Sequence, residues 1–553
     1  MRIWLLILLS TTSLLLTQSC NHNPLSNSQN SLEESQRTQS LIDHKSAPND
    51  FLALRYSYPN ETPNFKLFEK TKRDIEKLRG ESKSLPGFDQ SWRLEGPGNI
   101  GARINIIAPH PTNADIMLIG YSTGGIFKTT NGGGFWYPVF DHAAYSAISA
   151  IDYDPSNPDI IYAGTGDHNL PGNPFAGDGV HKSVDGGESW TQIGLAETGI
   201  IAKLVVDHSN SNIIYAGTMG FPFQPDSNRG LYKSTDGGSS WNNILYIGDS
   251  TGVIDVVMHP TNSNILLAAG WDRIRNNTTS LISGQGAKIY RSEDAGATWQ
   301  MMTNGLPQDD QSRIGLTAVP SNPNRFFAEY IGLDFQVQGV YETNDAGLTW
   351  TQKSAIGLQG TSGGFGWYFG QIRNNPSNDT ELYHCAVNLY RSFNGGDNWS
   401  RITNSGNGSQ HVDMHDLKFD AAGNTWLATD GGLYRKLLGE TLWTDMENIP
   451  TTQFYRIAAD PHDAEMYYGG AQDNGTSVGD SSNFNNWDRI FGADGFSIVF
   501  HPTDSNTLYV ETQNGNIYKS INNGNSFSNI TSGINAPEAV SYTHLTLPTT
   551  PYV

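Results

Sequence analysis

One nine-residue phrase recurs along this chain at intervals of about fifty residues. Its clearest copy is Lys182-Ser-Val-Asp-Gly-Gly-Glu-Ser-Trp190, and the next is Lys233-Ser-Thr-Asp-Gly-Gly-Ser-Ser-Trp241. Two further copies end at Trp299 and Trp350, and weaker copies span residues 128–136, 391–399 and 519–527. A fixed period of this length indicates a stack or ring of equivalent units. The repeat therefore constrains the architecture strongly and the activity hardly at all.

Each unit contains four short strands. Residues 202–207, 213–218 and 230–234 are rich in β-branched and aromatic side chains, and Trp241 opens a fourth strand after a Gly-rich turn. Four antiparallel strands form one blade of a β-propeller, so the predicted fold is an all-β propeller over residues 91–539. About nine blades are counted from the aromatic residue that closes each unit: Trp136, Trp190, Trp241, Trp299, Trp350, Trp399, Trp443, Trp487 and Phe527. Nine blades fit either part of a ten-blade ring or one ring that leads into a second.

The acidic residue of the repeated phrase has a predicted structural role. These residues are Asp185, Asp236, Asp294 and Asp345. Their carboxylates can accept hydrogen bonds from backbone amides of their own turn, and the neighbouring Gly residues allow a positive φ. The Trp that follows is expected to fill the space between neighbouring sheets. We therefore interpret these aspartates as part of the scaffold.

The pattern Ser-x-Asp-x-Gly-x-x-Trp resembles the Asp-box, or BNR repeat, of large secreted bacterial proteins. Relatives of this kind include sortilin-type propellers, xyloglucanase-type tandem propellers and sialidases. The Phe-Arg-Ile-Pro segment of sialidases does not occur in the sequence. The resemblance to xyloglucanases implies an Asp in the first blade, but the matching stretch here is Tyr121-Ser-Thr-Gly-Gly125, with a hydroxyl residue in place of the acid. This difference weakens the hydrolase interpretation, because glycoside hydrolysis needs two carboxyl groups.

The chemically richest residues are expected on the face opposite the Asp-boxes. The Asp-box lies between the third and fourth strands of a blade, whereas the long loops join the second strand to the third or lead into a new blade. His411, Asp413 and His415 alternate, and a strand would project them from one side. Asp430, Asp473 and Asp494 occupy neighbouring loop positions, so all six could converge at the mouth of the channel.

Three interpretations of this group stay open. His411, Asp413 and His415 could bind a divalent metal ion, although the fold itself requires no cofactor. Asp430 and Asp473 could be the catalytic carboxyl pair of a glycoside hydrolase. All of them could instead be hydrogen-bonded turn residues.

Aromatic and basic residues on the same face have similar alternatives. Trp367 and Tyr368, together with Asp494, are candidates for ligand binding, although aromatic residues at the start of a strand also pack between blades. Arg103 and Arg313 could bind an anion or pair with the surplus carboxylates of a chain whose net charge is −21. Such a negative charge repels phosphate backbones and makes nucleic acid an unsuitable partner.

The two ends differ from the repeats. Residues 1–20 have a basic start, an apolar run and Leu16-Thr-Gln-Ser-Cys20, which resembles a lipoprotein cleavage site with lipidation at Cys20; plain secretion is the alternative. Residues 21–90 are expected to form a polar tether with a short helix. Residues 540–553 break the repeat and resemble a translated adapter sequence, so we expect the natural chain to continue beyond about Ala539.

These observations predict an exported or surface-anchored β-propeller whose only membrane attachment is lipid at Cys20. The predicted function is binding of an extracellular carbohydrate or protein by the face that carries the long loops. The alternatives are a glycoside hydrolase that uses the same aspartates and a structural or adhesive surface protein.

Overall fold

The computed structural model describes residues 94–532, except 172–173, 277–278 and 404–409, together with Thr71 and Asp74. The predicted leader, Cys20, the tail after Ala539 and almost all of the predicted tether lie outside the described residues. Within the described part of the chain, no helix is both long enough and apolar enough to cross a membrane.

Nine four-stranded antiparallel sheets make up the described chain, and within each sheet the strands are hydrogen-bonded in chain order. The first three sheets contain β1 (Ile104–Pro109), β2 (Met117–Tyr121), β3 (Ile126–Thr129) and β4 (Tyr137–Pro138); β5 (Ile148–Tyr153), β6 (Ile161–Thr165), β7 (Val180–Ser183) and β8 (Thr191–Gly194); and β9 (Ile201–Val206), β10 (Ile214–Thr218), β11 (Gly230–Ser234) and β12 (Asn242–Leu245). The next three contain β13 (Thr251–Met258), β14 (Leu266–Asp272), β17 (Ile289–Ser292) and β18 (Gln300–Met301); β19 (Ile314–Ala318), β20 (Phe326–Ile331), β21 (Val337–Thr343) and β22 (Thr351–Gln352); and β23 (Gln371–Asn375), β24 (Asn378–Cys385), β25 (Leu389–Ser392) and β26 (Ser400–Arg401). The last three contain β27 (Met414–Phe419), β28 (Thr425–Thr429), β29 (Gly432–Lys436) and β30 (Thr444–Asp445); β31 (Phe454–Ala459), β32 (Tyr467–Ala471), β33 (Gly475–Gly479) and β34 (Asp488–Phe491); and β35 (Ile498–Phe500), β36 (Leu508–Thr512), β37 (Asn516–Ser520) and β38 (Ser528–Asn529).

A few short elements lie in the loops. The hairpin of β15 (Ile274–Arg275) and β16 (Ser280–Leu281) decorates the loop between β14 and β17. The described residues also form three single-turn 3₁₀ helices, η1 (Ala196–Thr198), η2 (Ser481–Asn483) and η3 (Gln513–Gly515). The predicted all-β fold is confirmed.

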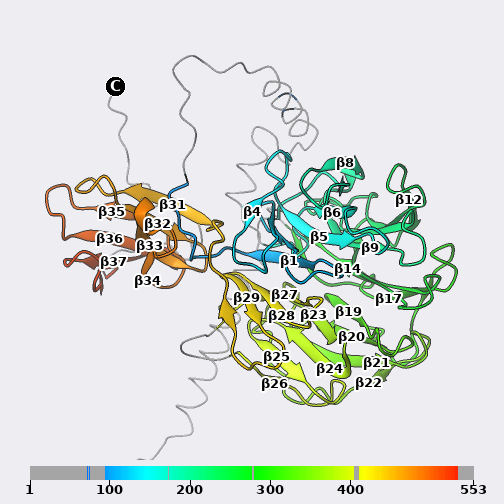
Figure 1. Ribbon diagram of the computed structural model, residues 1–553. Coiled ribbons are helices and arrows are strands. Elements are labelled where there is room, and N and C mark those ends of the chain that lie inside the picture. Colours follow the sequence, from blue (N-terminus) through cyan, green and yellow to red (C-terminus); the bar gives the residue numbers. More distant parts are fainter. Residues whose placement is uncertain are drawn as a thin grey trace, which may run out of the picture. The chain divides into compact units, whose positions relative to one another are not determined.

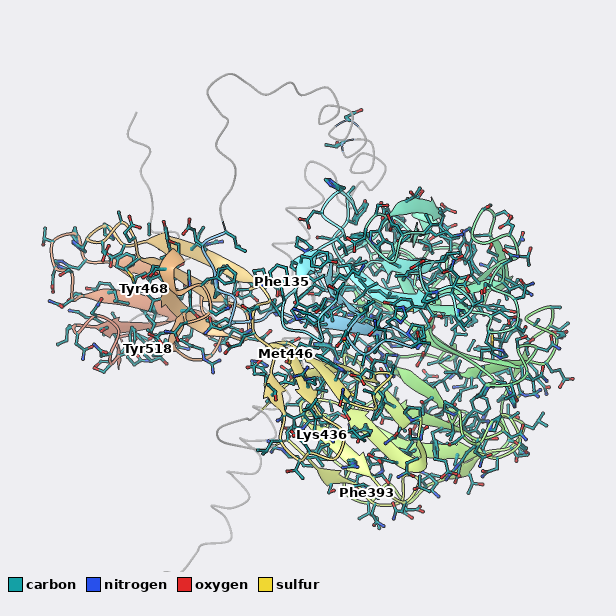
Figure 2. The ribbon with its side chains drawn as sticks, viewed as in Figure 1. Phe135, Phe393, Lys436, Met446, Tyr468 and Tyr518 are labelled. Atoms are coloured by element: carbon teal, nitrogen blue, oxygen red, sulfur yellow. The ribbon has the colours of Figure 1, made fainter. Side chains whose placement is uncertain are left out.

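The first seven sheets close into a ring (Figure 1). Their first strands pack side by side in the order β1, β5, β9, β13, β19, β23 and β27, and β27 and β28 then pack against β1. A buried apolar cluster joins the two ends of the ring: Ile104, Ile107 and Met117 of the first sheet contact Trp426 and Leu433 of the seventh. Met446, which follows β30, packs against this cluster (Figure 2). The ring therefore has seven blades, and the ten-blade alternative is wrong.

The eighth and ninth sheets lie outside this ring and pack on each other. Their shared apolar cluster contains Tyr468, Leu508 and Val510, and Tyr518 packs against it (Figure 2). This arrangement agrees with the second alternative, in which one ring leads into further blades.

The nine predicted closing aromatics occupy equivalent places, because each one directly precedes the fourth strand of its sheet. Trp241 of the third sheet, for example, packs against a cluster that contains Tyr162 and Val180 of the second sheet. The aromatic residues therefore fill the space between adjacent blades, as predicted.

The Asp-boxes lie in the turns between the third and fourth strands, as predicted. In the second sheet the Asp185 carboxylate accepts hydrogen bonds from the Ser183 hydroxyl at 2.7 Å and from the Ser189 amide at 2.9 Å. The Ser183 hydroxyl in turn accepts one from the Gly187 amide at 2.8 Å. Asp185 has a pKa lowered to about 2, chiefly because the Ser189 hydroxyl also donates to it. Long loops, by contrast, join second strands to third strands at the other face of the ring.

Candidate functional site

Arg103 joins carboxylates from two different sheets at the start of β1. Its Nε donates to Asp430 Oδ1 at 2.6 Å, and its Nη2 donates to Asp430 Oδ2 and to Asp473 Oδ2, both at 3.2 Å. Asp430 directly follows β28 in the seventh sheet, and Asp473 follows β32 in the eighth. The contact therefore lies where the seven-sheet ring meets the next two sheets; we call it the junction site, and it comprises Arg103, Asp413, His415, Asp430 and Asp473.

The segment before Arg103 reaches the junction because glycine lets it approach other backbones closely. A Cβ atom on Gly101 would lie 2.5 Å from the Cα of Gly432, a contact that real side chains do not make. Just before it, the Gly98 amide donates to the carbonyl of Phe484 at 2.7 Å. This segment therefore ties the first sheet to the seventh and the eighth.

Asp430 is buried, and both oxygens of its carboxylate have hydrogen-bond partners. Its side chain is 4% exposed, and His415 Nε2 contacts the same Oδ1 that receives Arg103 Nε. On its own, burial would raise the pKa of Asp430, but the charge of Arg103 and the contact with His415 outweigh it and hold that pKa well below its usual range. Asp430 therefore stays ionised and bound to its two partners.

Asp473 is the more accessible acid of the pair, with 21% of its side chain exposed. The backbone of Asp473 has a φ of 60°, and its amide donates a hydrogen bond to Asp494 Oδ1 at 2.7 Å. Burial and then the negative charge of Asp430 raise the pKa of Asp473 well above its usual range, although Arg103 acts in the opposite direction. The two acids thus have pKa values displaced in opposite directions, an arrangement found in acid–base pairs.

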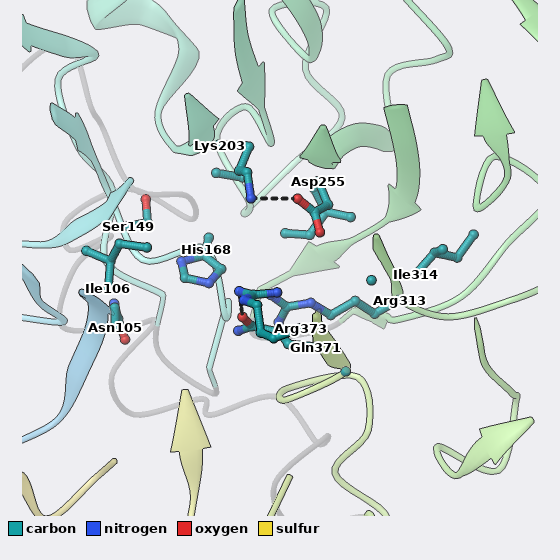
Figure 3. A pocket seen from close by; sticks show the side chains of 14 residues that line it. Asn105, Ile106, Ser149, His168, Lys203, Asp255, Arg313, Ile314, Gln371 and Arg373 are labelled. Carbon is teal, nitrogen blue, oxygen red and sulfur yellow. Dashed lines mark hydrogen bonds and ion pairs between the residues drawn. The ribbon is translucent and has the colours of Figure 1, made fainter. Parts of the chain in front are cut away.

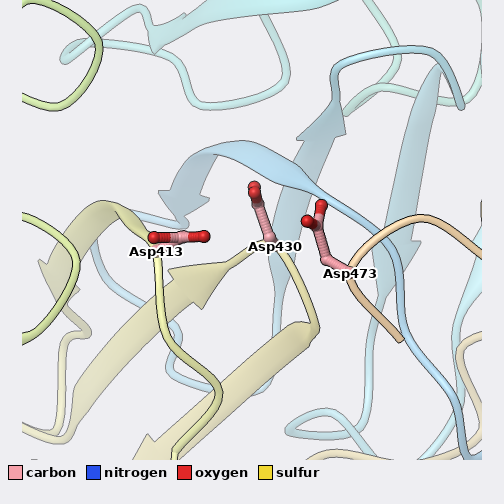
Figure 4. A group of neighbouring side chains, drawn as sticks. All are labelled: Asp413, Asp430 and Asp473. Atoms are coloured by element: carbon pink, nitrogen blue, oxygen red, sulfur yellow. The ribbon is translucent and has the colours of Figure 1, made fainter. Parts of the chain in front are cut away.

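Asp413 completes a group of three carboxylates at the junction site (Figure 4). One oxygen from each of Asp413, Asp430 and Asp473 lies within 4.8 Å of the others. The Arg103 guanidinium already supplies positive charge to two of them. Acidic groups in this arrangement do not by themselves define a metal site.

The predicted metal ligands His411, Asp413 and His415 do not come together as a set. The strand β27 begins only at Met414, and Asp413 has φ 67°, so the alternation needed to align the three is broken. His411 Nε2 lies 3.0 Å from the carbonyl oxygen of Asp473, whereas His415 faces Asp430 and Asn169. Both histidines hold protein groups in place, and Asp413 alone joins the carboxylate group.

The predicted ligand-binding residues also divide. Trp367 is 2% exposed and packs in the core, 5.1 Å from the guanidinium carbon of Arg273, so it offers no face to a ligand. Tyr368 lies at the junction site, with its ring centroid 5.8 Å from the guanidinium carbon of Arg103. Asp494 is buried and fixes the backbone of Asp473. Of the three, Tyr368 contacts Arg103 of the junction site, Asp494 supports Asp473 through the backbone amide of Asp473, and Trp367 is separate from the site.

Ser122 occupies the position where the resemblance to xyloglucanases implies a carboxylate. It follows β2, is buried, and its hydroxyl has no hydrogen-bond partner among the described residues. Its amide donates to the carbonyl of Arg103 at 3.3 Å. A hydroxyl here cannot replace a carboxyl group in proton transfer at neutral pH.

Sequence reasoning foresaw that Arg103 pairs with surplus carboxylates but missed Asn169. The Asn169 side-chain amide lies 3.2 Å from His415 Nδ1, and its oxygen accepts from Arg313 Nη1 at 3.1 Å. Asn169 belongs to a long loop with no motif of its own, so no local signal marks it.

Comparison with known proteins gives the same architecture. The profile of the family described as "Sortilin, neurotensin receptor 3" matches residues 178–308, which include three of the closing tryptophans. The sheets and the recurring phrase make this chain a β-propeller with BNR-type repeats, and residues 178–308 are similar to the sortilin family. It is 25% identical over 368 residues to a xyloglucanase of Hypocrea jecorina, covering 56% of this chain and 40% of that protein. It is 22% identical over 401 residues to xyloglucanase Xgh74A of Acetivibrio thermocellus, covering 64% of this chain and 44% of that one.

Solved structures support the fold of this BNR-type propeller. An ancestral GH74 enzyme superposes with a TM-score of 0.60 at 17% identity, covering 79% of this chain and 64% of that one. The GH74 xyloglucanase of Xanthomonas campestris gives 0.57 at 18% identity, covering 79% and 68%. The match spans less than half the length of the curated xyloglucanases named above.

Proposed function

We propose that this propeller binds an extracellular polysaccharide at the junction site and does not cleave it. Xyloglucanases among the relatives support a polysaccharide as the ligand class. The observation that carries the proposal is the unequal exposure of the two acids: Asp473 can reach a ligand, whereas Asp430 is closed off by Arg103 and His415. Hydroxyl groups of a sugar can donate to Asp473 and Asp413, because carboxylates are strong acceptors.

The absence of cleavage follows from the same contacts. Both established mechanisms of glycoside hydrolysis need two carboxyl groups that can reach the substrate or its attacking water. Asp430 has both oxygens engaged, and Ser122 stands where the resemblance implies an acid. Of the pair Asp430 and Asp473, only Asp473 would remain accessible to a substrate.

Binding is tested by affinity electrophoresis of the full chain in gels that contain xyloglucan or another soluble polysaccharide. We expect retardation in at least one gel and about tenfold weaker binding for Asp473→Asn, because a hydrogen bond to a charged group contributes roughly 1.5–3 kcal/mol. Asp236→Asn removes the same charge from the opposite face and should bind like the wild type. Equal binding by the two variants would place the ligand elsewhere.

Hydrolysis is the second candidate, favoured by the opposite pKa displacements of Asp430 and Asp473 and by their oxygens lying within 4.8 Å. Such closeness resembles the carboxyl separation of about 5–5.5 Å in retaining glycosidases. Release of reducing ends from a polysaccharide that binds, lost in Asp473→Asn, would establish this candidate and refute non-cleaving binding.

We also propose that the protein is exported and held on the cell envelope by lipid at Cys20. The leader-like residues before Cys20 support this location. Labelling of the wild type with a radioactive fatty acid, absent in Cys20→Ala, is the expected result. Equal labelling of both proteins would exclude Cys20 as the site.

A further inference from the structure

The first strands of the ring line a small polar cavity of about 30 Å³, and its lining residues differ from the members of the junction site (Figure 3). Lys203, Asp255, Arg313 and Arg373 line it from four different sheets or their lead-in loops. Three of these side chains are cationic and one is anionic. The cavity therefore carries an excess of positive charge in its own wall.

Two of the three cations have a carboxylate partner, and the third does not. Lys203 Nζ lies 3.0 Å from Asp255 Oδ1, and Arg373 Nε lies 3.0 Å from Asp416 Oδ1. Arg313 is 3% exposed and forms no ion pair with any described residue. The charges of Asp255 and Asp167 favour the charged form of Arg313 without forming an ion pair with it, and burial outweighs them.

The hydrogen bonds of Arg313 leave much of its guanidinium unused. Nη1 donates to Asn169 Oδ1 at 3.1 Å and to the carbonyl of Tyr368 at 2.6 Å. No hydrogen bond from Nε or Nη2 to a described residue is found, although this side chain lines the cavity. Burial lowers the pKa of Arg313 only to about 10, so it remains charged at neutral pH.

Two further polar side chains in the wall lack partners. His168 and Gln371 are 6% and 5% exposed, and neither His168 Nδ1 nor Gln371 Nε2 has a hydrogen-bond partner among the described residues. Figure 3 shows both side chains directed toward the same space as Arg313. Unpaired polar atoms are rare in protein interiors and usually mark a bound water or ion.

We propose that this cavity binds one small inorganic anion of about the size of chloride, with Arg313 as its counter-charge and His168 and Gln371 as additional donors. A cavity needs a volume of at least about 10–15 Å³ to hold one water molecule. The cavity of about 30 Å³ can therefore hold one monoatomic anion or two water molecules. A sugar ring is too large for it. The anion is therefore a structural ligand that neutralises the centre of the ring.

The first experiment measures the melting temperature of the full chain in sodium chloride and in sodium gluconate at equal ionic strength. Gluconate is too large for the cavity and controls for screening. We expect a rise of about 2 °C when chloride reaches about ten times its dissociation constant, since a ligand bound to the folded state stabilises it. Arg313→Gln should abolish the difference, and Arg401→Gln, which removes an exposed charge on β26, should keep it.

The second experiment does not depend on a variant that folds. Wild-type crystals grown or soaked in sodium bromide should show an anomalous peak in contact with Arg313, and the same salt series in solution should show the stabilisation seen with chloride. A cavity that contains only water in bromide, or a melting temperature equal in chloride and gluconate, would overturn the proposal.

Discussion

Arg103 is the residue on which the junction site depends most, since one guanidinium group contacts Asp430 of the seventh sheet and Asp473 of the eighth. Its two contacts differ in kind. Asp430 is buried and further held by His415, whereas Asp473 is partly exposed. Replacement of Asp430 should therefore change the stability of the protein differently from replacement of Asp473.

Asp430→Asn should destabilise the protein by about 3–5 kcal/mol, because it leaves Arg103 buried beside a neutral group. Denaturation in urea, followed by tryptophan fluorescence, measures the change. Asp473→Asn is the matched control and should not lower stability at neutral pH, because the raised pKa of Asp473 means that its charge is unfavourable in the folded protein. Losses of equal size would show that the burial of Asp430 does not decide the energetics of the site.

Asp473 should also make stability depend on pH. Its folded-state pKa is raised, so the stability it contributes is fully present below the unfolded value of about 3.9 and is lost as the pH rises through the folded value. Asp473→Asn should therefore have a higher melting temperature than the wild type at pH 7, and the difference should vanish below about pH 4. A wild type that melts higher than the variant at pH 7 would contradict the direction given for this carboxyl group.

Asp430 behaves in the opposite way. Its lowered pKa gives stability that is present above the unfolded value and is lost only as the pH falls through the folded value, in the strongly acidic range. The pH dependence of wild-type stability thus combines two opposite effects, one from Asp430 and one from Asp473. The variants Asp430→Asn and Asp473→Asn separate them.

At the scale of the element, the Asp-box works through an acceptor oxygen and not through its charge. Asn131, Asn394 and Asn522 take the place of the acid in the first, sixth and ninth sheets. Their side-chain oxygens accept from the amides of Phe135, Asn398 and Ser526 at 3.0, 2.9 and 3.0 Å, the same bond that Asp185 makes.

Asp236→Asn should consequently leave the melting temperature within about 1 °C of the wild type, while Asp236→Ala should lower it clearly. The Asp236 carboxylate accepts from the Ser234 hydroxyl at 2.8 Å and the Ser240 amide at 2.9 Å, and Ala offers no acceptor. Calorimetry of the two variants checks this. An equal loss in both would mean that the negative charge itself is needed.

Elements that repeat could be predicted from the sequence, and those that occur once could not. The closing aromatics and Asp-boxes were located correctly because the same local physics recurs in each sheet. The stretch from His411 to His415 was expected as a strand, but the chain turns at Asp413 to donate its amide to the carbonyl of Val387. Val387 lies in the turn between β24 and β25 of the sixth sheet, and no pattern within residues 411–415 indicates that contact.

At the scale of the whole molecule, the number of blades in the ring is set by closure. Nine equivalent units are visible in the sequence, and none is marked as the last of a ring. Closure at seven depends on Trp426 and Leu433 packing against Ile104 and Met117, residues more than three hundred positions away. The junction site exists because the chain continues past this closure and returns Asp473 to Arg103.

Truncation after the seventh sheet separates the ring from the junction site. A chain that ends at Thr452 keeps all seven sheets, the closing cluster and the hydrogen bonds of Thr451 and Thr452 to Tyr121 and Ile100. It should therefore unfold in one cooperative transition with the circular dichroism of a β protein. It lacks Asp473 and should no longer be retarded by the polysaccharide that retards the full chain. Asp430 keeps its contacts with Arg103 and His415 in this chain. Loss of binding without loss of folding would therefore place recognition at the junction or on the removed sheets, whereas retained binding would place it on the ring alone.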